Sequence, residues 1–130
     1  MEPIRTTAAP APVQGAPYSQ AIDTGSLVFV SGQVPLDPAG VLVGDDIAVQ
    51  TRRCLANIAA ILAEAGLGLG DIAKTTVYMT DLGEFGAMNA AYAETFAAHA
   101  PARATVGVAA LPAGARVEID AIALRATAAG

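Results

Sequence analysis

Two segments of this chain repeat their apolar residues at helical spacing, and nearly everything else that looks regular has the pattern of a strand. The stronger helical segment begins after Asp45 or Asp46, either of which can cap it, and Gly66 can end it. Its polar residues Gln50, Arg53, Asn57 and Glu64 fall off the apolar stripe, so we expect them to face water. The stripe itself consists of Ile47, Thr51, Cys54, Leu55, Ile58, Ile61, Leu62 and Ala65.

The second helical segment starts near Asp81, which has capping-box spacing to Glu84. Gly83 and Gly86 weaken its first turn, and Pro101 closes it. Its stripe consists of Phe85, Met88, Tyr92 and Phe96.

Five strands surround these helices. Residues Tyr18–Ile22 and Leu27–Val30 flank the turn Asp23–Ser26 and predict a hairpin, and the chain after Ser31-Gly32-Gln33 is punctuated by prolines and predicts a loop. A third strand runs from Asp71-Ile72 through the β-branched and aromatic stretch Thr75–Met79. The last two strands, Ala102–Ala109 and Arg116–Arg125, are joined by Leu111-Pro112-Ala113-Gly114 and predict a second hairpin.

The order β-β-α-β-α-β-β predicts an α+β fold, a single mixed β-sheet with two helices packed on one face. The other sheet face then has no helix to cover it. In the final strand this face carries Glu118 and Asp120 beside Ile122 and Leu124, and a face that only met water would seldom carry those apolar residues. We therefore expect a homo-oligomer in which sheet faces pack together.

At 130 residues the chain has the length of one domain, taken as residues 16–130 after a lead-in strand or tail at 1–15. No apolar run is long enough for a membrane span, and Met1–Gly15 lacks the basic start and apolar stretch of a secretory signal. The single cysteine fits a reducing compartment, so a cytoplasmic location is expected. The net charge of −5, with basic residues scattered, argues against nucleic-acid binding.

Arg103 and Glu118 are the charged residues that suggest chemistry. Arg103 is either a surface arginine at a strand end or a fork that binds a carboxylate at two points. Glu118 is either an exposed acid or a general acid/base that holds water. A simple hairpin would place Glu118 opposite residue 107, about 13 Å from Arg103 along the strands, too far to grip one small molecule. A site completed across a subunit boundary is therefore expected.

Other reactive residues have plainer interpretations. Cys54 lies on the apolar stripe and is expected in the core. His99 sits at a helix end as a dipole partner or surface residue, and one His with one Cys makes no usual zinc site. Gly66, Gly68 and Gly70 loosely resemble a phosphate-binding loop, but such a loop follows a strand and these glycines follow a helix. They are therefore interpreted as a helix cap and turn.

Six segments, in order and register, resemble the Rid family, the YjgF/RidA reactive intermediate deaminases. The likeness spans nearly all of the chain beyond residue 15. The segments are Pro17-Tyr18-Ser19-Gln20, Ser31-Gly32-Gln33, Gly70–Val77, Met88–Tyr92, Pro101-Ala102-Arg103-Ala104 and Val117–Ala123.

The resemblance implies a chorismate-mutase-like homotrimer with an inner barrel of three sheets and sites in clefts between subunits. It implies hydrolysis of enamines and imines, such as 2-aminoacrylate and 2-iminobutanoate or 2-iminopropanoate, to 2-keto acids and ammonia. Pyridoxal-phosphate-dependent dehydratases release such species, and the Rid protein itself is expected to need no cofactor and no metal. Its expected partners are a small imine or enamine substrate and other copies of itself, without nucleic acid or membrane.

The resemblance also implies residue roles. The family's carboxylate-binding arginine falls on Arg103 and its water-orienting glutamate on Glu118. The pocket positions fall on Tyr18, Ser31, Gly32, Asn89 and Thr105. Two positions depart from the pattern, because Ala16 replaces a frequent Gly and Thr105 stands where some deaminases have Cys. The alternatives are a non-catalytic trimer that binds small carboxylates, as a sensor, chaperone or pathway accessory, and an endoribonuclease, which the acidic charge disfavours.

Overall fold

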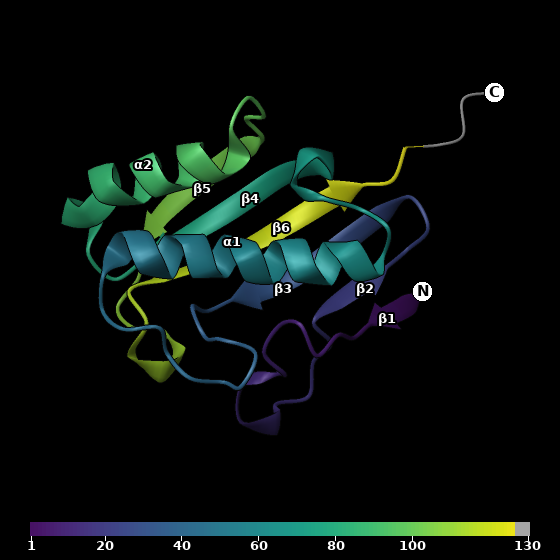
Figure 1. The fold of residues 1–130 in the computed structure, drawn as a ribbon, viewed down its shortest axis with the longest axis horizontal. Coiled ribbons are helices and arrows are strands. Elements are labelled where there is room, and N and C mark those ends of the chain that lie inside the picture. The colour runs from purple at the N-terminus through teal and green to yellow at the C-terminus, as the bar shows by residue number, and fades with distance from the viewer. Residues whose placement is uncertain (127–130) are drawn as a thin grey trace.

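A six-stranded mixed sheet forms one layer of the molecule, and two helices form the other (Figure 1). The computed structural model describes residues 1–126. Its strands are β1 (Glu2–Ile4), β2 (Ala21–Asp23), β3 (Leu27–Gln33), β4 (Ile72–Met79), β5 (Ala102–Gly107) and β6 (Val117–Leu124), and its helices are α1 (Ile47–Glu64) and α2 (Phe85–Phe96). The strand order across the sheet is β1-β2-β3-β6-β4-β5. The predicted α+β class is thus confirmed.

The hairpin predicted at the start of the domain is confirmed, with shifted ends. β2 and β3 pair antiparallel, with Ile22 opposite Phe29. β2 begins only at Ala21, whereas β3 continues past Val30 through the Ser31-Gly32-Gln33 motif. A short strand precedes this hairpin in the chain, since β1 pairs antiparallel with β2.

The second predicted hairpin is wrong. β5 pairs parallel with β4, and β6 does not touch β5 but lies between β3 and β4, antiparallel to both. The physical reason is that β4, α2 and β5 form a strand-helix-strand unit, whose two strands run parallel as neighbours. β6 then fills the centre of the sheet, where both of its edges find backbone partners.

Both helices cover one face because of the direction in which the sheet grows. The crossovers β3-α1-β4 and β4-α2-β5 step across the sheet in the same direction. Crossovers of this kind are almost always right-handed, so two steps in one direction place both helices on one side. Figure 1 shows α1 and α2 in front of the sheet, with its other face uncovered.

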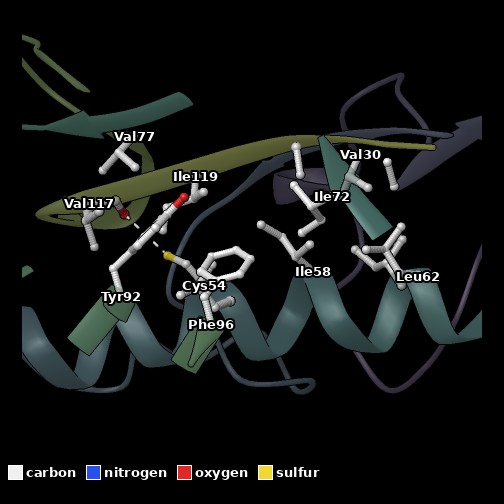
Figure 2. Close-up of a cluster of buried hydrophobic side chains, with 14 of the residues drawn as sticks. Val30, Cys54, Ile58, Leu62, Ile72, Val77, Tyr92, Phe96, Val117 and Ile119 are labelled. Carbon is white, nitrogen blue, oxygen red and sulfur yellow. Dashed lines mark hydrogen bonds between the residues drawn. The ribbon is translucent and has the colours of Figure 1, made fainter. Parts of the chain in front are cut away.

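The core lies between α1, α2 and the helix side of the sheet (Figure 2). Cys54, Ile58 and Leu62 of the α1 stripe are fully buried. Cys54 lies against Val117 and Ile119 of β6, which are also fully buried, whereas Leu62 lies beside Val30 and Ile72 further along the sheet (Figure 2). The Cys54 thiol donates a 3.7 Å hydrogen bond to the Val117 carbonyl, so the lone cysteine is a core residue as expected.

The prediction that the polar side of α1 faces water is wrong at Gln50 and Asn57, which are both 0% exposed. The loop between β3 and α1 folds over them. The Asn57 amide donates to the carbonyls of Val34 (3.3 Å) and Leu36 (2.9 Å). Gln50 donates to the Gly44 carbonyl and accepts from the Arg116 backbone N–H. These amides hold a loop that has no regular structure of its own.

The ends of the helices follow their local sequence signals. Asp46 caps α1 by accepting from the Val49 N–H, and Gly66, with φ of +74°, follows the helix end. α2 begins later than Asp81 because a 3₁₀ turn, Leu82–Glu84, comes first. Neither α1 nor α2, the helices of residues 1–126, combines the length and apolar character needed to span a bilayer.

Asn57→Ala should lower the free energy of unfolding by about 2 kcal/mol, because it leaves the buried Leu36 carbonyl without a donor and the Val34 carbonyl with only the Leu36 backbone N–H. Arg52→Ala on the same helix is the control, since it removes only an exposed 3.8 Å ion pair with Glu94 and should cost no more than about 1 kcal/mol. Urea unfolding at matched protein concentration measures both. Equal losses in the two variants would contradict a clamping role for Asn57.

Candidate active site

A cavity of about 550 Å³ opens beside the ends of β3 and β6, on the sheet face without helices. The 3₁₀ turns Val13–Gly15 and Pro112–Gly114 contribute to its rim. Its lining is largely apolar, with a polar side formed by three of the predicted site residues. The lining residues are Val13, Gln14, Ala16, Tyr18, Ser31, Gly32, Val34, Pro112, Ala113 and Glu118. The structure therefore brings together Tyr18, Ser31, Gly32 and Glu118, from separate parts of the sequence.

Glu118 reaches this cavity because successive side chains of a strand point to opposite faces. Its neighbours Val117 and Ile119 are buried under the helices, so Glu118 points the other way. It takes part in none of the ion pairs within residues 1–126. Its carboxylate is thus half-buried, faces open volume and is not neutralised by a cation of the described chain.

The surroundings of Glu118 favour its protonated form. Burial raises the pKa of its carboxyl above the ordinary 4.5, and the negative charge of Asp120 raises it further. Asp120 lies two residues along the same face and is itself anchored. It accepts hydrogen bonds from the Tyr78 hydroxyl (3.0 Å) and the Thr76 backbone N–H (3.1 Å).

Gly32 provides the space that Glu118 occupies. A Cβ atom at residue 32 would overlap Oε2 of Glu118 and lie 2.9 Å from its Cδ. The pairing of β3 with β6 also shifts register between Val30 and Gln33, and such irregularities commonly redirect a strand beside functional sites. A side chain at residue 32 would thus displace the Glu118 carboxylate from its position beside the cavity.

Tyr18 and Ser31 fix the loop that walls the cavity. The Tyr18 hydroxyl accepts a 2.8 Å hydrogen bond from the Val13 backbone N–H. The Ser31 hydroxyl donates to the Ser19 carbonyl at 2.6 Å. Tyr18 therefore closes the 13–18 loop on itself, and Ser31 holds residue 19 against β3.

Arg103 lies elsewhere, on the helix side of the edge strand β5. It is paired in register with Thr75, whose buried hydroxyl is hydrogen-bonded to Tyr92 of α2 at 2.7 Å. The Arg103 guanidinium carbon lies 4.8 Å from the centroid of the Tyr92 ring and 5.6 Å from that of Phe85. The arginine therefore rests against the aromatic side chains of α2.

The other two predicted pocket residues accompany Arg103. Asn89 lies on α2 four residues after Phe85 and three before Tyr92, which places all three on one side of the helix. Thr105 follows Arg103 by two residues on β5, so it lies on the same sheet face. Asn89 and Thr105 are both half-buried.

The predicted site residues thus form two groups that do not meet within one chain. Arg103 is opposite Thr75 and Glu118 is opposite Tyr78 on the two sides of β4. Two strand spacings and three residues of rise put their Cα atoms about 14 Å apart. The separation is close to that expected from a hairpin, although β5 and β6 do not pair. The structure adds that the two side chains lie on opposite faces of the sheet.

Sequence reasoning missed two features of these groups. Phe85 was assigned to the core stripe of α2, yet it is 42% exposed and sits beside Arg103. Asp120 was noted only as part of a mixed face. Its spacing of two residues from Glu118 in a strand was the available signal that the two carboxylates share a face.

The chain is similar to known proteins over nearly its whole length. A family model described as Endoribonuclease L-PSP matches residues 6–125. A 2-iminobutanoate/2-iminopropanoate deaminase of Salmonella typhimurium is 46% identical over 125 residues, 94% of this chain and 96% of that protein. A RutC family protein of Pyrococcus abyssi is 48% identical over 125 residues, covering 95% and 97% of the two chains.

Solved structures carry the same fold. The crystal structure of E. coli TdcF with bound serine superposes with a TM-score of 0.90 at 41% identity, covering 97% of this chain and 100% of that one. The family expected from the six sequence segments is confirmed. The chain belongs to the Endoribonuclease L-PSP family, the YjgF/Rid family.

Proposed function

We propose that this protein is a 2-iminobutanoate/2-iminopropanoate deaminase, which hydrolyses reactive imines to 2-keto acids and ammonia. The observation that carries the proposal is the Glu118 carboxylate, half-buried in a largely apolar cavity, with a raised pKa and the space left by Gly32. The 46% identity to a deaminase of that name supports it.

We further propose that the working unit is a homotrimer whose sites lie between subunits. Arg103 and Glu118 cannot reach one small ligand in a single chain, because they lie on opposite faces of the sheet. The uncovered face also presents Phe29, 43% exposed, and Leu124, 51% exposed. Their cross-strand partners Ile122 and Leu27 extend this apolar surface, which favours packing against other copies.

The chemistry needs no nucleophilic side chain. Arg103 of one subunit would bind the substrate carboxylate with its paired N–H donors. Glu118 of the next would hold a water over the imine carbon and accept its proton as the C–O bond forms. The same carboxyl returns that proton to the nitrogen, which gives the neutral carbinolamine. It then takes the hydroxyl proton as the C=O bond forms and delivers it to the departing nitrogen, so that the C–N bond breaks and ammonia and the keto acid are released. Binding both reactants in place supplies much of the acceleration.

The first test of the activity follows formation of 2-ketobutanoate from freshly generated 2-iminobutanoate. Acceleration over buffer is expected for the wild type. A protein that binds 2-ketobutanoate but gives no acceleration would instead be a non-catalytic carboxylate-binding protein. RNA cleavage that persists through further purification and in Arg103→Ala would support the activity that gives the family its name.

Glu118→Gln should abolish most turnover without lowering the melting temperature, because an uncharged amide fits a site that already disfavours charge. In the wild type the ionised carboxylate is the active form, so kcat should fall as pH drops through the Glu118 pKa. Since that pKa is raised, the fall should centre above 4.5. The pH profile of kcat measures this. An acid limb that persists unchanged in Glu118→Gln would assign it to another group.

Mixing inactive subunits tests whether the site lies between chains. Arg103→Ala and Glu118→Gln chains, each inactive alone, should regain activity when co-assembled, because some interfaces then combine an intact Arg103 with an intact Glu118. In a cyclic trimer assembled at random from equal amounts, about one quarter of the interfaces are intact. A mixture of preformed oligomers that do not exchange is the control. Co-assembled chains with no activity would contradict a shared site.

A further inference from the structure

The environment of Arg103 differs from that of the other arginines with side-chain partners. Arg52, Arg116 and Arg125 each face a carboxylate, and Arg53 donates to the Asn57 amide. Within residues 1–126, Arg103 takes part in none of the ion pairs. Its guanidinium instead contacts the rings of Phe85 and Tyr92. In a chain with 12 acidic and 7 basic residues, this positive charge is held without being neutralised.

Aromatic contacts restrain a guanidinium without using its donors. All five N–H groups of arginine point outward in the plane of the ion, and its flat faces carry none. A ring centroid within about 6 Å of the cation attracts it through the ring's quadrupole. Both distances, 4.8 Å and 5.6 Å, fall inside this range. The rings can therefore fix the position of Arg103 while its N–H groups stay available to a carboxylate.

The two rings are anchored differently. Tyr92 is 7% exposed and projects from α2 into the core beside Val117 (Figure 2). Its hydroxyl is hydrogen-bonded to Thr75, and its ring packs on Phe96 with centroids 4.7 Å apart. Phe85 lies at the start of the same helix and is 42% exposed. Burial in the core therefore does not account for a phenylalanine at residue 85.

We propose that Phe85 and Tyr92 form a cation–π clamp, in which they act as positioning residues that hold Arg103 ready for two-point binding of the substrate carboxylate. The inference rests on the proposed function in one respect, the role of Arg103 as the carboxylate-binding group. It adds a consequence of its own, namely that loss of the clamp weakens binding of the carboxylate and leaves the chemical step at Glu118 unchanged.

Phe85→Leu tests the clamp, because it keeps an apolar side chain of similar size and removes the ring. KM for 2-iminobutanoate should rise about two- to fivefold, with kcat and the melting temperature unchanged. Phe85→Tyr should restore the wild-type KM because it restores a ring. Leu82→Ala is the matched control. It removes another exposed apolar side chain, 51% exposed and three residues earlier, and should leave KM as it is.

A second measurement keeps the clamp separate from the proposed function. The dissociation constant of 2-ketobutanoate, measured by calorimetry on wild type and Phe85→Leu, requires no turnover and should rise by the same factor. Wild-type protein that binds but does not turn over the imine would overturn the deaminase and leave the clamp standing. Active wild type with equal KM and equal dissociation constants in Phe85→Leu would overturn the clamp. A fall in kcat and melting temperature at constant KM would also overturn it.

Discussion

The two-sidedness of β6 is the constraint on which the rest of the structure depends. One side of this central strand supplies Val117, Ile119, Ala121 and Ala123 to the core, all 2% exposed or less. The other side places Glu118 and Asp120 on the uncovered face. A slip of one residue in its pairing would exchange these sets, burying two carboxylates under the helices and exposing the core. Burial of the apolar side therefore fixes the pairing register of β6, and with it the face of the sheet on which Glu118 lies.

The position of Glu118 and the cavity in front of it depend on different parts of the chain. Glu118 is set by the core, but the volume in front of it depends on Gly32, on the anchored 13–19 segment and on the Pro112–Gly114 turn. Asp120, held by Tyr78 and Thr76, keeps a second negative charge near Glu118 and helps to raise its pKa. The burial of the apolar side chains of β6 and the raised pKa of Glu118 thus both follow from the alternation of side chains along this strand.

The sequence predicts the elements of this fold better than their pairing. Helical periodicity, Asp46 and Gly66 located α1, and β-branched residues located β4, because these signals are local. The position of β6 is a long-range property. The loop before it resembled a hairpin connection, and only the completed sheet shows that β5 pairs with β4, to which α2 connects it. Gln50 and Asn57 were placed in water because periodicity cannot foresee a loop folding over a helix.

For the candidate site, too, the sequence indicated residues but not their arrangement in space. The resemblance to known sequences predicted that Glu118, Gly32 and Arg103 belong to one kind of site. No sequence pattern reveals that Arg103 and Glu118 lie on opposite faces of the sheet. Phe85 was equally hidden, since a phenylalanine on a helical stripe is usually part of the core. Its exposure becomes informative only when the strand carrying Arg103 is placed beside α2.

The placement of Arg103 and Glu118 on opposite faces has a consequence for dosage. Under the proposed function, a chain that keeps these two groups on opposite faces would not work alone, and its specific activity would decline on dilution below the dissociation constant of the assembly. Such a protein would have little effect when scarce and would respond more than proportionally as its abundance rises through that threshold. Expression level would then act as a switch, without any allosteric ligand.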